Sequence, residues 1–304
     1  MSKRKPRPKL YSPRVWGSWA AVAMAWLIAR LPLPAVIALG RGIGALGYRL
    51  ARRRRHIAEV NLSLCLPELD TSDRRQLLRR TFTHLGVGLA ETLMVWLHPG
   101  RSVAARFSVS GAEHLAAAEA LGRGVVLISA HFTSMDIAAQ PLAASGHVDL
   151  IYRENKDPVL EWLQVRGRRH YFDAVIERAD TRRILRRLQS GRTLWYAADQ
   201  DYGRKHSLFA PFFGIPAATI TATARLARAN GSPVLFMSQH RDLPNLRWHL
   251  QFSPVLEGFP SGDELADATR INTLVEAAVR EYPEQYLWVH RRFKTRPEGE
   301  RAVY

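Results

Sequence analysis

The sequence has a single cysteine, Cys65, among its 304 residues. One cysteine cannot form a disulfide within the chain, so an internal disulfide framework is excluded and a reducing compartment is the natural environment. The eleven histidines form no His-Glu-x-x-His pattern, and no Cys-x-x-Cys pair is present. We therefore predict that the protein binds no metal and needs no cofactor.

Acidic residues are scarce beside basic ones, with 27 Asp and Glu against 44 Lys and Arg and a formal net charge of +17. This charge implies an acidic partner, which composition alone leaves open between nucleic acid, anionic lipid head groups, a phosphorylated substrate and an acidic protein. The apolar fraction of 47% supplies a core for one large or two small domains, so a globally disordered chain is excluded.

The N-terminal region lacks an uninterrupted apolar run of the ~20 residues that a spanning helix needs. Residues 15–29 are uncharged and carry three tryptophans, but Arg30 and Pro32 follow, and basic clusters lie at 1–9 and 52–55. Because basic flanks favour the cytoplasmic side, we expect a membrane anchor that lies along or dips into the interface, with a single span as the alternative. A cleaved signal peptide is the competing interpretation, although the arginines that follow would oppose translocation.

Residues 42–47 match Gly-x-Gly-x-x-Gly, the dinucleotide-binding pattern. The match lies beside the anchor, is followed by arginines rather than by a βαβ unit, and has no acidic residue at the expected distance. We interpret these glycines instead as small residues that let helices pack closely.

Strands and helices alternate from residue 101 onward, which predicts an α/β fold with a mainly parallel sheet flanked by helices. We divide the chain into a basic N-terminus and anchor (1–55), a helical segment packed on the core (56–100), and a catalytic domain (101–304). In the second segment, residues 73–96 carry an apolar stripe that indicates core packing rather than a lipid-facing lid. Strands are expected over 107–109, 125–130, 148–152, 174–177, 193–198, 233–238 and 248–252, and helices over 113–121, 134–144, 158–168, 181–189, 217–229 and 263–281.

His131 follows the buried strand 125–130, and Asp136 follows it in the first turns of the expected helix. Sites in parallel sheets gather at the carboxyl ends of strands. A carboxylate on one ring nitrogen fixes the tautomer of a histidine and raises the basicity of the other nitrogen. We therefore expect His131 to be a general base and Asp136 to orient it, against the alternative of a strand-end histidine and a carboxylate serving the helix dipole.

Two further strand ends carry polar residues. The strand 148–152 delivers Arg153, whose planar guanidinium suits a phosphate. The strand 193–198 ends at Asp199 and Asp201, and Arg204 and Lys205 follow. Asp-x-Asp is also how many glycosyltransferases hold a divalent metal and a nucleotide diphosphate, so a membrane-bound, metal-dependent glycosyltransferase using Asp199 and Asp201 is the alternative function.

The C-terminal run Pro-Glu-Gln-Tyr-x-Trp-x-His-Arg-Arg-Phe-Lys-Thr-Arg-Pro, residues 283–297, resembles the signature of the bacterial lipid A late acyltransferases, the lauroyl and myristoyl transferase family. The His131-x-x-x-x-Asp136 spacing is similar to the motif of the wider glycerolipid acyltransferase superfamily. Asp199-x-Asp201-Tyr-Gly, Tyr-Arg153-x-Asn155, and the order of basic start, Trp-rich anchor and arginine cluster are also similar to the late acyltransferases. One departure is Asp136, where lauroyl members often carry Glu.

The resemblance implies an inner-membrane enzyme with its catalytic domain on the cytoplasmic face. It implies transfer of a fatty acyl chain, lauroyl-like, from acyl carrier protein to a hydroxyl of a Kdo-lipid IVA-type precursor. The partners implied are the acyl carrier protein, the precursor and membrane lipids, with no nucleic acid. We expect His131 and Asp136 to be catalytic, and the substrate-binding residues to be Arg153, Asn155, Asp199, Asp201, Arg204 and Lys205. The chain lacks a Gly-x-Ser-x-Gly elbow, so we expect direct transfer without an acyl-enzyme.

Overall fold

A computed structural model describes residues 9–144 and 146–304, so most of the basic start expected over residues 1–9 lies outside the described residues. The strands are β1 (Phe107–Ser110), β2 (Val125–Ser129), β3 (Val148–Tyr152), β4 (Val175–Glu177), β5 (Thr193–Ala197), β6 (Ser207–Phe212), β7 (Ile215–Ile220), β8 (Val234–Asp242) and β9 (Arg247–Phe252). The helices are α1 (Trp16–Ala29), α2 (Leu33–Leu50), α3 (Arg52–Cys65), α4 (Thr71–Leu97), α5 (Ala112–Glu119), α6 (Ala139–Ala143), α7 (Pro158–Arg168), α8 (Thr181–Gln189), α9 (Ala222–Asn230) and α10 (Glu264–Glu281).

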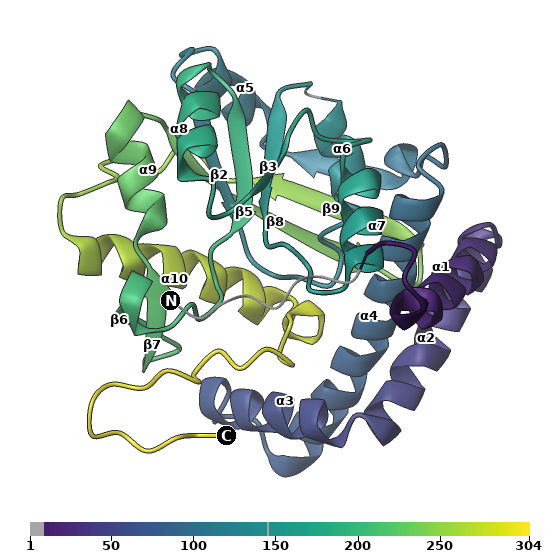
Figure 1. Ribbon diagram of the computed structural model, residues 1–304. Helices are drawn as coiled ribbons and strands as arrows, with labels where there is room; N and C mark the ends of the chain where they lie inside the picture. The colour runs from purple at the N-terminus through teal and green to yellow at the C-terminus, as the bar shows by residue number, and fades with distance from the viewer. Residues whose placement is uncertain (1–8, 145) are drawn as a thin grey trace.

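Seven strands form one sheet in the order β1-β9-β8-β2-β5-β3-β4 (Figure 1). Every neighbouring pair is parallel except β8 and β9, which form an antiparallel hairpin. The predicted mainly parallel α/β sheet is therefore confirmed. Since β2, β5 and β8 are adjacent and parallel, their carboxyl ends meet at one edge of the sheet, and this edge carries the polar residues described below.

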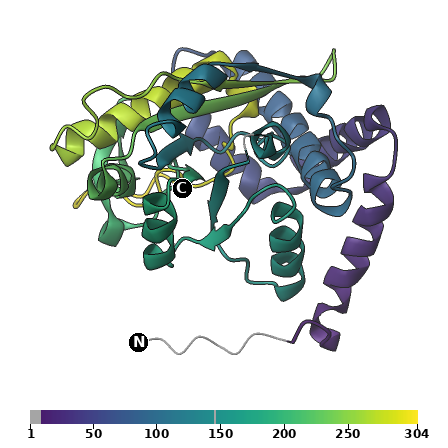
Figure 2. The same ribbon diagram turned by 90° about the horizontal axis from the view of Figure 1, so that it is seen from above.

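The central strand β2 is buried on both faces, as its unbroken apolar run predicts. Val126 and Ile128 pack on one side with α8, α9 and α10, whereas Val125 and Leu127 pack on the other side with α5 and α6. The view from above shows this sheet enclosed between helices, with α1 standing at the periphery (Figure 2). The two-sided burial makes the sheet a rigid support for the loops at its edge.

The two-stranded hairpin β6–β7 was not predicted, and part of it replaces the first turns of the helix expected over 217–229. Pro211 and Pro216 stand opposite each other in the hairpin, and prolines argue against a strand in a sequence. Phe213 and Gly214 both adopt positive φ at the turn, which is the geometry of the tight turns favoured in hairpins. The helix begins only after it, as α9.

The N-terminal helices α1 and α2 lie against α4, which separates them from the sheet (Figure 1). No helix in the described part of the chain has both the length and the apolar character that crossing a membrane requires. Gly44 lies at the crossing of α2 and α4, where a Cβ would meet the carbonyl oxygen of Phe82 at 2.3 Å; a Cβ on Gly86 would meet that of Gly40 at 2.2 Å. The interpretation of the 42–47 glycine motif as a helix-packing element is confirmed at Gly44.

Candidate active site

His131 lies at the carboxyl end of β2, and its ring is held by a carboxylate from the neighbouring strand end. The Nδ1 of His131 donates to Oδ1 of Asp199 at 2.6 Å, and the backbone N–H of His131 donates to Oδ2 at 3.1 Å. The side chain of Asp199 is 3% exposed and that of His131 is 25% exposed. With Nδ1 as the donor, Nε2 carries the lone pair that can accept a proton.

Asp199 stays ionised despite its burial. Burial alone would raise its pKa, but the charge of His131 and the hydrogen bonds from His131 and from the hydroxyl of Tyr286 hold the pKa well below its usual value. Burial and the neighbouring Asp199 charge raise the pKa of Tyr286 well above its usual value, so its hydroxyl remains a neutral donor. The site therefore contains a fixed negative charge beside the imidazole of His131.

Asp136 was expected to orient the His131 ring, and the structure corrects this expectation. Oδ1 of Asp136 accepts from Nε1 of Trp96 at 3.1 Å and forms an ion pair with Nε of Arg168 at 3.0 Å. Among the described residues no hydrogen bond or ion pair joins Asp136 to His131. The carboxylate on the imidazole is therefore that of Asp199, from outside the His131-x-x-x-x-Asp136 motif, while Asp136 within the motif pairs with a guanidinium.

The position of Asp136 also differs from the expected one. The helix predicted over 134–144 shortens to α6, and Asp136 lies in the turn that precedes it. The N–H groups of Ala139 and Gln140 bond three residues back rather than four. Pro141 follows directly and cannot extend an α-helical ladder toward Ile137, because it has no N–H and its ring would clash there.

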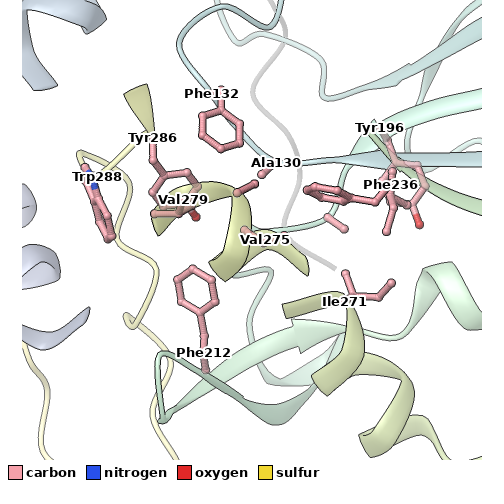
Figure 3. Packing of buried hydrophobic residues seen from close by; sticks show 14 of the residues in the cluster. Ala130, Phe132, Tyr196, Phe212, Phe236, Ile271, Val275, Val279, Tyr286 and Trp288 are labelled. Atoms are coloured by element: carbon pink, nitrogen blue, oxygen red, sulfur yellow. The ribbon is translucent and has the colours of Figure 1, made fainter. Parts of the chain in front are cut away.

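The C-terminal segment fixes the main chain of His131 from the outside. Phe132 and Tyr286 form an isolated antiparallel bridge, and the N–H of Leu287 donates to the carbonyl of His131 at 3.0 Å. Figure 3 shows the ring of Tyr286 beside Phe132, at the end of the core cluster nearest Trp288. Residues 285–287 of the signature-like run therefore hold the main chain of residues 131–133 in place.

A buried ion pair contacts the loop that follows His131. Arg241 on β8 binds both carboxylate oxygens of Glu91 on α4, and the two side chains are 0% and 1% exposed. Arg241 also donates to the hydroxyl of Thr133 at 3.2 Å, while Gln285 bonds the backbone of Arg241 in both directions. The residues after His131 are thus tied to a sheet strand, a helix and the C-terminal segment at once.

Asp201, two residues beyond Asp199, is used differently. Its carboxylate accepts from the N–H of Gly203 at 2.8 Å and from the N–H and hydroxyl of Thr295 at 2.8 and 2.9 Å. Lys294 donates to its carbonyl at 2.8 Å. The two carboxylates of the Asp-x-Asp pair therefore bind separate protein donors instead of converging on one point, which is a poor fit to a shared divalent metal.

Of the other predicted binding residues, Asn155 forms hydrogen bonds within the protein, whereas three cations are exposed. Asn155 sits in the turn before α7, where its side chain accepts from the N–H of Asp157 at 3.1 Å and its N–H donates to Glu161 at 2.7 Å. The exposed cations are Arg153, Arg204 and Lys205. Asn155 thus has a local structural contact, and a substrate contact for it stays a prediction.

Tyr202, three residues beyond Asp199, lies among positive charges. Burial raises the pKa of Tyr202, and the positive charges of Arg178 and Arg153 oppose that shift while the charge of Asp199 adds to it. The guanidinium of Arg178 stacks 4.5 Å from the ring centroid of Tyr202. The charges of Arg178 and Arg153 therefore both act on the Tyr202 hydroxyl, and Arg178 also contacts its ring.

Sequence reasoning missed four residues of this site: Arg168, Tyr286, and the pair Glu91 and Arg241. Tyr286 falls within the C-terminal motif, so the motif could have pointed to it. The other three lie on strands or helices remote in sequence from His131, and no local pattern marks them. Only the tertiary packing brings them together.

An imidazole oriented by a buried carboxylate at the carboxyl edge of an α/β sheet is the arrangement of an enzyme that uses a general base. Comparison with known families identifies the chemistry: residues 3–295 match the bacterial lipid A biosynthesis acyltransferase family. The chain belongs to this family and is an acyl-transferring enzyme of lipid A biosynthesis.

Individual relatives align with this chain over nearly their full lengths. The chain is 38% identical to a lipid A biosynthesis palmitoleoyltransferase of Escherichia coli K12 over 293 residues, covering 96% of this chain and 95% of that one. It is 36% identical to the lauroyltransferase of the same organism, covering 97% of both chains. Identity to its myristoyltransferase is 29%, covering 96% and 91%. The resemblance inferred from the C-terminal motif is therefore confirmed.

Proposed function

We propose that the protein transfers a fatty acyl chain from an acyl carrier protein thioester to a hydroxyl of a Kdo-lipid IVA-type precursor, with His131 as general base. The observation that carries this proposal is the hydrogen bond of 2.6 Å between His131 and the buried Asp199. Nε2 of His131 takes the proton of the 3-hydroxyl on an acyl chain of the precursor. Asp199 holds the ring and stabilises the imidazolium that forms.

The hydroxyl oxygen then attacks the thioester carbonyl directly. The new C–O bond forms, the C–S bond breaks, and the proton on His131 passes to the departing thiolate, so that ester and thiol are the products. Cys65 is not a competing nucleophile, because burial raises the pKa of its thiol and it is 1% exposed. This supports a transfer without an acyl-enzyme.

Exposed cations suit the anionic groups of both substrates. Arg153 is our candidate for a phosphate or for the developing oxyanion, since it is exposed and directly follows β3 at the carboxyl edge of the sheet. Arg204 and Lys205 are candidates for a precursor phosphate or an acidic face of the carrier protein. Because these interactions are between exposed charges, we expect activity to fall at high salt.

We propose further that the enzyme works at the cytoplasmic face of the inner membrane. Helix α1 presents Trp16, Met24 and Leu27 to the outside, each more than 60% exposed. Arg14 and Arg30 flank this apolar surface. Exposed tryptophan and aliphatic side chains beside arginines are typical of a helix that lies in the interface of a membrane.

The test is transfer of a radiolabelled acyl group from carrier protein thioesters of C10 to C16 to a tetra-acylated lipid A precursor, in membranes containing wild type or His131→Ala, with excess chelator present. We expect one preferred chain length in wild type and loss of product in the variant. No transfer by wild type at any length would refute the proposed substrates. Equal transfer by the variant would leave acyl transfer standing but remove His131 as the base.

A further inference from the structure

An open cavity of about 860 Å³ lies between α1, the end of α4 and α7, apart from the His131–Asp199 pair. Its walls are mainly aromatic and aliphatic: Trp19, Ala23 and Trp26 of α1 face Trp96 of α4 and Trp162 of α7. Its size and apolar walls are typical of a small-molecule site. Its lining includes neither residue of the His131–Asp199 pair and neither residue of the Asp136–Arg168 ion pair.

One wall of the cavity is part of the catalytic region. Trp96 lines the cavity, donates its indole N–H to Asp136 at 3.1 Å, and lies under the guanidinium of Arg168 at 5.2 Å. A Cβ on Gly167 would lie 2.5 Å from the Cβ of Trp96, so this glycine lets α7 approach the indole directly. The cavity and the turn after His131 therefore share a single side chain.

The rim of the cavity is cationic. Arg166 lines it and stacks 5.4 Å from the ring centroid of Trp162. Arg166 also borders a second, shallower pocket of about 580 Å³, which contains Arg169. Positive charge beside an apolar cavity complements a lipid with an anionic head group.

The acceptor needs an apolar site for the acyl chain that carries its attacking hydroxyl. In the proposed reaction the attacking hydroxyl is on the third carbon of an acyl chain, so the rest of that chain must leave His131 on a path of its own. We propose that the cavity between α1, α4 and α7 receives the apolar tail of this hydroxyacyl chain, with the precursor's phosphate near Arg166. This inference rests on the proposed function and adds the location of the acceptor lipid.

The position of the cavity opening favours the acceptor chain over the donor chain as the occupant of the cavity. Five of its lining residues belong to α1, and one of them, Leu27, is 62% exposed, as is the neighbouring apolar residue Met24 at 66%. A lipid that arrives from the membrane would meet this surface first. The donor chain arrives attached to a water-soluble acidic protein, for which an apolar membrane-side entry is unsuited.

The test narrows the cavity without touching the catalytic residues. Ala23→Phe places a ring in the cavity, and Ala21→Phe is the matched control, because both alanines are exposed on α1 but only Ala23 lines the cavity. We measure the KM for acceptors whose hydroxyacyl chains differ in length, the preferred donor length, and binding of the acceptor alone. We expect Ala23→Phe to raise the acceptor KM about tenfold for long chains and less for short ones.

The donor preference and the behaviour of Ala21→Phe should match wild type. A shift of the preferred donor length in Ala23→Phe would assign the cavity to the donor and overturn the inference, as would an unchanged acceptor KM and affinity. Absence of any transfer by wild type counts against the proposed function alone, since binding of the acceptor to wild type and Ala23→Phe still tests the cavity.

Discussion

The Nδ1 of His131 lies 2.6 Å from Oδ1 of Asp199, although 68 residues separate the two in the chain. The contact exists because β2 and β5 are hydrogen-bonded neighbours, with Ser129 opposite Ala197, so that their carboxyl ends deliver both side chains to the same edge. Three groups converge on the Asp199 carboxylate: the ring and N–H of His131 and the hydroxyl of Tyr286. This preorganisation underlies the predictions that follow.

Asp136 should act on the reaction through Arg168. Asp136→Asn and Arg168→Gln should each lower kcat about tenfold or more, because each removes the charge that holds the other in place beside Trp96. The double variant should lose little more than either single variant, as expected for two residues of one interacting pair. Steady-state kinetics of the three variants measure this, and losses that multiply in the double variant would show that Asp136 and Arg168 act independently.

Gly88→Ala should displace the loop after His131. A Cβ at Gly88 would meet the carbonyl oxygen of Thr133 at 2.2 Å, so either α4 or the loop must move. Because misplacing catalytic groups by about 1 Å can cost on the order of 100-fold in rate, we expect a large drop in kcat. The matched control is Gly42→Ala in α2, where a Cβ meets nothing within 4 Å. It should keep activity and gain about 0.5–1 kcal/mol of helix stability.

Breaking the buried pair of Arg241 and Glu91 should destabilise the protein by about 3–5 kcal/mol, because a charge is left buried without its partner. Denaturant unfolding of Glu91→Gln in detergent measures the change in the free energy of unfolding. The exposed pair of Arg280 and Glu68, with side chains 52% and 55% exposed, is the control. Glu68→Gln should cost less than about 1 kcal/mol, and similar losses in both variants would contradict the role given to burial.

Stability should fall as the pH drops from neutral to about 5. Burial and the neighbouring Arg241 lower the pKa of His84 to about 3, so His84 stays neutral in the folded protein at this pH. The unfolded chain binds a proton at an ordinary pKa of about 6.5, so it takes up more protons than the folded state and acid favours unfolding. For His84 alone the loss is about 2 kcal/mol at pH 5.

Unfolding curves of wild type and His84→Gln at pH 7 and pH 5 separate this contribution from those of other groups. Glutamine keeps an acceptor for Arg241, which lies 3.0 Å from Nδ1 of His84, but it does not titrate. The variant should therefore lose less stability than wild type between the two pH values. An equal loss in both proteins would place the acid sensitivity elsewhere, for example at His240 or His290, whose pKa values are also lowered by burial, each to about 4.

The sequence predicted the centre of the sheet well because a strand such as β2 is an unbroken buried apolar run that follows a glycine. It also located His131 and Asp199 at strand ends. It did not predict that they pair, because the spacing to Asp136 is local and the contact to Asp199 depends on strand order in the sheet. The β6–β7 hairpin was not predicted, because its two facing prolines, Pro211 and Pro216, argue against strands.

The most direct test of the account compares kcat for Asp199→Asn with that for its neighbour Asp201→Asn, using acyl carrier protein thioester and lipid precursor. Asp199 bonds the ring of His131, the proposed base, whereas Asp201 bonds the hydroxyl of Thr295. We predict that Asp199→Asn lowers kcat by about 10²–10⁴-fold, because general-base catalysis contributes on that scale. Asp201→Asn should mainly lower stability. If Asp199→Asn kept kcat within a few-fold of wild type, the His131–Asp199 pair would not be the catalytic centre.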